Sequence, residues 1–84
     1  MAATPFVAIS GFSFQPASLE IAAGATVTWE NQDAAPHTVT AVDGSFDSGQ
    51  LLSGASFDAT FEQPGTFDYA CAIHPSMTGT IVVS

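Results

Sequence analysis

Apolar and polar residues alternate along most of the chain with a period of two. In the segment ATVTWEN, Val27, Trp29 and Asn31 fall on one face, and threonine and glutamate side chains fall on the other. The same alternation recurs in SLEIA, HTVTA, SFDATF, TFDYAC and GTIVVS. A period of two is typical of strands that bury one face, and no window carries the apolar stripe of a helix.

Turn-forming residues separate these segments at short intervals. They are Gly11, Pro16, Gly24, the segment 33–36, Gly44, Gly49, Gly54, Pro64, Gly65 and Gly79. Seven or eight short strands in 84 residues predict an all-β fold, an antiparallel Greek-key β-sandwich. There is no internal repeat and no linker, so we expect one domain over residues 1–84.

Composition narrows the possible functions. Hydrophobic residues make up 46% of the chain, which is enough for one core, but no apolar run is long enough to predict a membrane span. The chain has eight Asp and Glu but no Lys or Arg, so binding to nucleic-acid phosphates is not expected. The acidic residues either keep the domain soluble or face a partner with a basic docking surface.

Four possible metal donors stand at the ends of predicted strands or in the loops beside them. His37 begins a strand after the turn DAAP, and the single Cys71 ends another. His74 and Met77 follow Cys71 at intervals of three residues, in the loop before the last strand. If the strands of His37 and Cys71 are neighbours, these four side chains converge at one end of the sandwich.

A thiolate, two imidazoles and a thioether form the ligand set of a type 1 copper site. Zinc accepts cysteine and histidine but rarely takes a thioether as its fourth ligand. Each residue alone has an ordinary explanation, because single cysteines and methionines usually fill cores and a loop histidine is usually solvated. The combination of all four at compatible positions favours a metal site.

The segments WENQDAAPHTV and FEQPGTFDYACAIHPSMTGTIVV resemble the two copper-binding segments of the cupredoxins, and the similarity runs from about Phe12 onward. The short Cys-x2-His-x2-Met loop is most similar to that of the amicyanins within this plastocyanin-like family. The resemblance implies one copper ion per chain, with His37, Cys71 and His74 as equatorial ligands and Met77 as the axial ligand. The other methionine, Met1, is excluded by its terminal position.

The resemblance also gives a role to Asn31, which lies six residues before His37. In the family, the asparagine at this place ties the two copper loops together, so Asn31 is expected to support the site. By its position alone, Asn31 could instead cap the turn into QDAAP.

The resemblance implies a blue, type 1 copper protein that carries single electrons and is not an enzyme. A module for copper storage or delivery is the alternative, because it would use the same ligands. A second, catalytic copper would need histidines beyond the two in the chain.

We expect redox partners to dock around His74, where the neighbouring loop residues are apolar. These residues are Ala34, Ala35, Pro36, Ala72, Ile73 and Pro75. We also expect a monomer. The N-terminus MAATPFVAIS lacks the features of a signal peptide, so a periplasmic or other extracytoplasmic location is inferred from the family alone.

Overall fold

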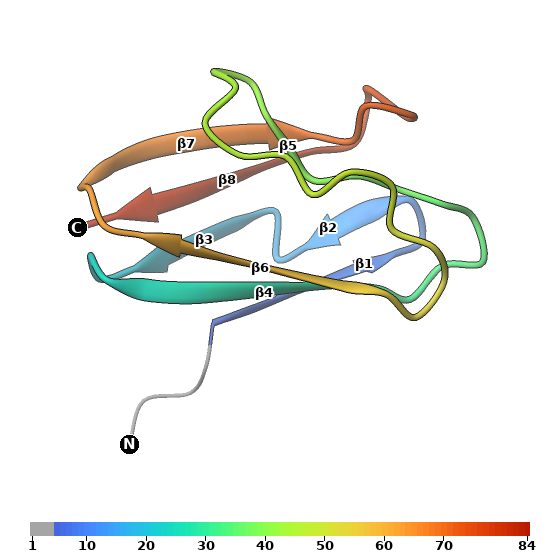
Figure 1. Ribbon diagram of the computed structural model, residues 1–84, viewed down its shortest axis with the longest axis horizontal. Coiled ribbons are helices and arrows are strands. Elements are labelled where there is room, and N and C mark those ends of the chain that lie inside the picture. Colours follow the sequence, from blue (N-terminus) through green and yellow to red (C-terminus); the bar gives the residue numbers. More distant parts are fainter. Residues whose placement is uncertain (1–4) are drawn as a thin grey trace.

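The computed structural model describes residues 5–84, which form two four-stranded sheets packed face to face (Figure 1). One sheet has the order β2-β1-β4-β6 and the other the order β3-β8-β7-β5. The strands are β1 (Phe6–Ser10), β2 (Ser13–Gln15), β3 (Ser18–Ile21), β4 (Ala25–Asn31), β5 (Thr40–Ala41), β6 (Ser56–Phe61), β7 (Gly65–Ala70) and β8 (Thr78–Val83). The predicted all-β sandwich is confirmed.

The sheets are mixed, which corrects the expectation of wholly antiparallel pairing. β1 pairs with β4 in parallel, and β3 pairs with β8 in parallel, while the other strand pairs are antiparallel. The parallel partners are not consecutive in the chain, and β3 in the second sheet separates β1 and β2 from β4. Alternation of apolar residues reports which face is buried but not strand direction, so the sequence pattern could not reveal this.

The core forms where the inner faces of the two sheets meet. Val27, Trp29 and Asn31 on β4 are fully buried, as their shared face predicts. The Trp29 ring lies edge-on to the ring of Tyr69 on β7, with ring centres 5.5 Å apart. This aromatic contact joins the two sheets close to the end of the sandwich where β4 and β7 both end.

The segment 37–41, predicted as one strand, forms a regular strand only at Thr40 and Ala41. The amide of Thr38 donates to the sulfur of Cys71 and the amide of Val39 donates to the hydroxyl of Ser48, so neither pairs with a strand carbonyl. His37 keeps an isolated bridge to Leu51, exchanging backbone hydrogen bonds of 3.1 and 2.7 Å. The side-chain acceptors therefore interrupt the ladder next to the predicted site.

The antiparallel pairing of β5 with β7 positions the predicted ligands. Thr40 is opposite Ala70, so the residues just before β5 and just after β7 meet at the same end of the sandwich. This confirms that the segments of His37 and Cys71 are neighbours. Within residues 5–84, no helix is long and apolar enough to cross a membrane. Met1 lies outside the described residues.

Candidate metal centre

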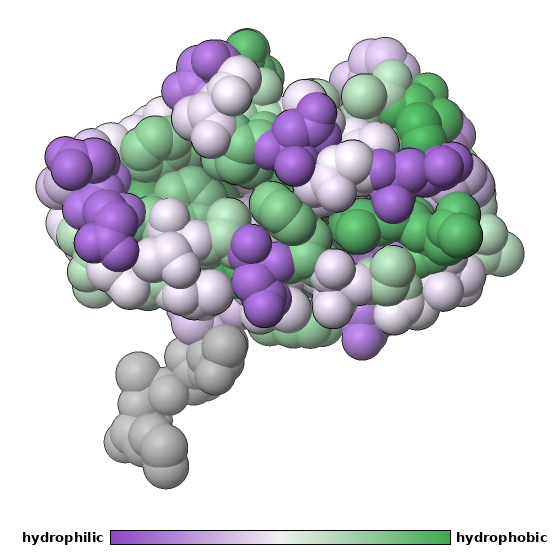
Figure 2. Space-filling model, viewed as in Figure 1, coloured by the Kyte–Doolittle hydropathy of each residue, from purple (hydrophilic) through white to green (hydrophobic). Residues whose placement is uncertain are grey.

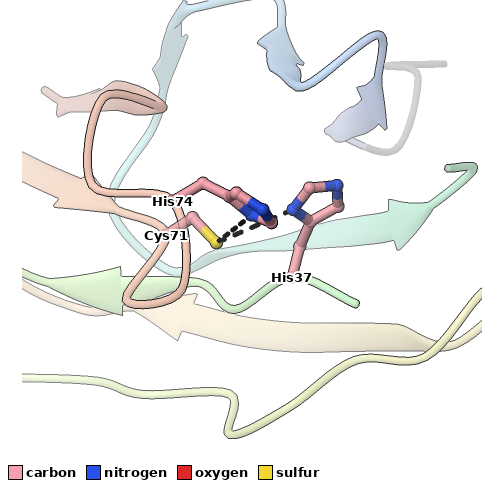
Figure 3. A group of neighbouring side chains, drawn as sticks. All are labelled: His37, Cys71 and His74. Atoms are coloured by element: carbon pink, nitrogen blue, oxygen red, sulfur yellow. Dashed lines mark hydrogen bonds between the residues drawn. The ribbon is translucent and has the colours of Figure 1, made fainter. Parts of the chain in front are cut away.

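Cys71 lies at the centre of the predicted site. It follows the last residue of β7 and is completely buried as a free thiol. Its sulfur lies 3.7 Å from Nδ1 of His37 and 3.9 Å from Nδ1 of His74 (Figure 3). The donor atoms of these three residues all lie within 4.8 Å of one another. The three residues, which come from two separate segments, therefore share one possible metal position.

The two histidines differ in their exposure to solvent. His37 is fully buried, as expected from its place at the start of an inward-facing segment. His74 is partly exposed and sits in the loop between β7 and β8. Their rings lie 5.0 Å apart, and each directs a nitrogen toward Cys71 (Figure 3). One imidazole is thus enclosed, while the other connects the cluster with the surface.

Met77 is brought next to the cluster by the backbone of the loop. Its amide donates to the carbonyl of His74 at 2.9 Å, and its own carbonyl accepts from the amide of Cys71 at 3.0 Å. Its side chain is 4% exposed and belongs to the core cluster that includes Cys71. The loop is therefore closed on itself, and its last donor is buried beside the first.

Thr38 joins the two segments that carry the donors. Its backbone amide donates to the sulfur of Cys71 at 3.3 Å, and its hydroxyl accepts from the amide of Ala72 at 2.7 Å. A hydrogen bond to the sulfur stabilises the thiolate over the thiol, while the second bond holds the loop that follows Cys71. Thr38 is thus the direct link between the two loops that sequence reasoning assigned to Asn31.

Asn31 orders the loop that carries His37. Its side-chain amide donates to the carbonyls of Ala35 and Leu51, both at 2.9 Å, and its side-chain oxygen accepts from the amide of Asp33 at 2.9 Å. The bonds with Ala35 and Asp33 fit the turn-capping alternative, because they fold the segment after β4 back on itself, while the bond to Leu51 ties this turn to the residue that bridges with His37. They reach the Cys71 loop only through His37 and its neighbour Thr38, so any effect of Asn31 on a metal is indirect.

The surroundings favour the ionised form of Cys71. Burial alone would raise the pKa of the thiol, but hydrogen bonds from the backbone amides of Thr38 and His74, with smaller contributions from the two neighbouring imidazoles, outweigh it. Together they lower the pKa of Cys71 from 9.0 to about 6. A thiolate is the form that binds a metal, so the metal-free protein already holds the donor near neutral pH.

The chemistry of the donor set fits copper. A buried thiolate with two imidazole nitrogens within 4 Å suits a soft or borderline metal, and the thioether of Met77 is buried in the core cluster that includes Cys71. Hard cations such as magnesium prefer oxygen donors, and none of the three clustered donor atoms is an oxygen. The described residues can thus provide three soft or borderline donors for one metal ion.

Sequence reasoning missed two residues that contact the histidines, Asp33 and Phe12. Asp33 lies 2.9 Å from Nε2 of His37, and the ring of Phe12 lies edge-on to both imidazole rings. A carboxylate four residues before a histidine in one loop was a usable signal for Asp33. Nothing in the local sequence marks Phe12, because it reaches the site from the hairpin between β1 and β2.

Comparisons with known proteins give a consistent result. A family model for a cupredoxin-like domain matches residues 3–83, so the similarity begins earlier than Phe12. The chain is 38% identical to amicyanin-alpha of Methylorubrum extorquens, over 92% of this chain and 69% of that protein. It is 35% identical to the amicyanin of Paracoccus denitrificans, and there it covers 63% of the relative's length.

Solved structures show the same architecture. A purple cupredoxin from Nitrosopumilus maritimus matches with a TM-score of 0.88 and 33% identity, over 95% of this chain and 99% of that one. The Cu(I) form of an amicyanin variant matches with a TM-score of 0.91 and 32% identity, over 100% of this chain and 86% of that one. The likeness extends over the whole sandwich in both cases.

Proposed function

The chain belongs to the cupredoxin-like family, whose cofactor is copper, and on this premise we propose that it is a type 1 copper protein that carries single electrons between redox partners. One observation carries the proposal: a fully buried cysteine with one nitrogen of each histidine within 4 Å of its sulfur. We propose His37, Cys71 and His74 as equatorial ligands and Met77 as the axial ligand of one copper ion. Bound copper would supply a one-electron couple, Cu(II)/Cu(I).

The protein's own contribution is to hold the donors still. His37 and Cys71 are 0% exposed, and the loop that carries the other two donors is closed by two backbone hydrogen bonds. Donors fixed by packing keep similar positions in both oxidation states, so little rearrangement accompanies gain or loss of an electron. Asn31 contributes to this rigidity through the loop before His37.

The enclosure also favours a carrier over a module for copper storage or delivery. A delivery protein must expose its ligands to the receiving protein, whereas two of these three clustered donors are fully buried. An enzyme with a second copper is disfavoured because the chain has only two histidines and both belong to this cluster.

Electrons would enter and leave through the exposed edge of His74. The surface beside it is apolar: Phe12 is 52% exposed and Ile73 is 43% exposed. Figure 2 shows apolar surface at the end of the molecule where the loop after β7 emerges. A largely apolar face of this kind suits a brief encounter, since it offers few ion pairs that would slow dissociation.

The acidic surface bears on the choice of partner and location. A formal charge of −8 without any basic side chain favours partners with a basic face outside the apolar contact. We further propose that the protein acts as a monomer and, as its family resemblance implies, in an extracytoplasmic compartment.

Electron self-exchange tests the proposal directly. Mixing the reduced and oxidised copper-loaded forms should broaden proton NMR lines near the site, while a Cu(I) chelator should remove little copper on the same timescale. Ile73→Asp should slow the exchange by adding charge to the docking face, and Val42→Asp, at a position 76% exposed in the turn after β5, should not. Rapid copper loss to the chelator without self-exchange would favour delivery instead.

A further inference from the structure

The turn between β1 and β2 has an unusual conformation for its sequence. Its two central residues, Gly11 and Phe12, both have positive φ, +61° and +58°. Two such residues close a tight hairpin with the twist that strands prefer, but a bulky phenylalanine rarely adopts this conformation. A strained residue of this kind persists only when its surroundings hold it in place.

One carboxylate holds both amides of this turn. Oδ1 of Asp33 accepts from the amide of Gly11 at 2.8 Å, and Oδ2 accepts from the amide of Phe12 at 2.9 Å. Asp33 is itself oriented by Asn31, whose side-chain oxygen accepts from the Asp33 amide. The loop after β4 therefore holds the turn between β1 and β2 through two hydrogen bonds.

The same carboxylate also contacts a proposed metal ligand. Oδ2 of Asp33 lies 2.9 Å from Nε2 of His37, while Nδ1 of that ring faces the sulfur of Cys71 at 3.7 Å. An ionised carboxylate only accepts hydrogen bonds, so Nε2 must carry the hydrogen. The neutral ring then has its free lone pair on Nδ1, directed toward the position a metal would take.

Phe12 is placed over the imidazole pair as a result. Its ring centre lies 5.1 Å from that of His37 and 5.0 Å from that of His74, edge-on in both cases. The two histidine rings, 5.0 Å apart, are thus covered by one aromatic ring whose outer side faces solvent. The backbone position of this ring depends on the hydrogen bonds to Asp33.

We infer that Asp33 is a positioning residue of the metal centre: its carboxylate fixes the ring nitrogen that His37 presents to the metal and holds the hairpin turn that places Phe12 over both histidines. This inference rests on the proposed function for its meaning. The geometry itself involves only side chains and backbone of this chain and can be tested without copper.

The first test is the tautomer of His37 in the metal-free protein, read from the ¹⁵N chemical shifts of its ring at a pH where it is neutral. The wild type should carry the hydrogen on Nε2. Asp33→Ala should give a mixture of tautomers and faster hydrogen exchange at the amides of Gly11 and Phe12. Asp33→Asn, which keeps one acceptor oxygen for the three donors, should give a smaller change in both and covers the case that the alanine variant fails to fold.

The second test uses copper affinity and a matched control. Replacing a residue that orients a metal-binding histidine typically weakens binding 10- to 100-fold, and we expect a loss in that range for Asp33→Ala. Asp43→Ala removes the same charge from a turn where the carboxylate accepts from the amide of Ser45, and it should bind copper as the wild type does. Phe12→Ala should keep the His37 tautomer but let azide perturb the visible spectrum of the copper form.

If both Asp33 variants keep the wild-type tautomer and the wild-type amide exchange, the inference is overturned, whatever their copper affinity. An equal loss of affinity in Asp43→Ala would also overturn it, because net charge and not position would then explain the effect. If the tautomer changes as expected but the wild type binds no copper, the positioning role stands and the proposed function fails.

Discussion

Tyr69, the single tyrosine of the chain, lies close to the metal centre in sequence, and replacing it with phenylalanine removes one alkaline titration. Tyr69 is 1% exposed and lies two residues before Cys71, with its ring edge-on to those of Trp29 and Phe14. Burial raises the pKa of Tyr69 from 10.0 to about 12. The chain contains no Lys or Arg and only one Tyr, so no other side chain is expected to begin ionising between pH 10 and 12.

The sign of the effect follows from which state holds the proton. In the unfolded chain the phenol ionises near pH 10, whereas in the folded protein it stays neutral until about pH 12. Unfolding therefore releases a proton in this window, and the free energy of unfolding falls as the pH rises. Each pKa unit corresponds to about 1.4 kcal/mol, so the total loss should approach roughly 3 kcal/mol.

Urea denaturation of the metal-free protein at several pH values from 9 to 12 measures this loss. Wild-type stability should decline across the range, and the absorbance of the single phenolate should show a midpoint near pH 12. Tyr69→Phe should abolish the decline. It should change stability at pH 7 by about 1 kcal/mol or less, because the hydroxyl has no hydrogen-bond partner among the described residues. A parallel decline in both proteins would refute this explanation.

Three further outcomes follow from the packing and chemistry of the site. Met77→Ala should retain copper but shift its reduction potential and spectrum, and an unchanged potential would contradict the axial role. The same variant should lower the free energy of unfolding by about 2–5 kcal/mol, because the side chain is buried. Gly79→Ala should lower the free energy of unfolding in urea by about 1–3 kcal/mol, since the added Cβ would overlap Cζ and the hydroxyl oxygen of Tyr69; wild-type stability would show that the ring can move away. In the metal-free protein, the thiolate absorbance of Cys71 should rise with a midpoint near pH 6. Because the folded pKa is depressed from 9.0 to about 6, stability should rise with pH between these values, and a midpoint near 9 would contradict the hydrogen bonding at the sulfur.

Local sequence pattern was sufficient for the sandwich and for placing each donor at a strand end or in a loop, whereas the convergence of the donors depended on which strands are neighbours. The alternation in β4 correctly placed Trp29 and Asn31 on the buried face. His37 and Cys71 could be brought together because each stands at the end of an apolar face, and the pairing of β5 with β7 makes those ends neighbours. Each segment alone shows which alternate residues are apolar, so their burial can be predicted without knowledge of the fold.

The supporting contacts were beyond that pattern because they join segments far apart in the chain. Phe12 and Asp33 are separated by the strands β2, β3 and β4, and their hydrogen bond exists only once β1 and β4 lie side by side. Thr38 lies within the alternating segment HTVTA, yet its amide donates to Cys71 where the strand is interrupted. The parallel pairs likewise depend on the order in which the chain passes between the two sheets, and no single strand reveals that order.

The visible spectrum of the metal-free protein after addition of one equivalent of Cu(II) tests the central claim most directly, with Cys71→Ala measured beside it. We predict an intense thiolate-to-copper absorption band in the wild type and none in the variant. A colourless wild-type solution, or equal spectra for the two proteins, would contradict the assignment of Cys71 and its two histidines as a copper centre.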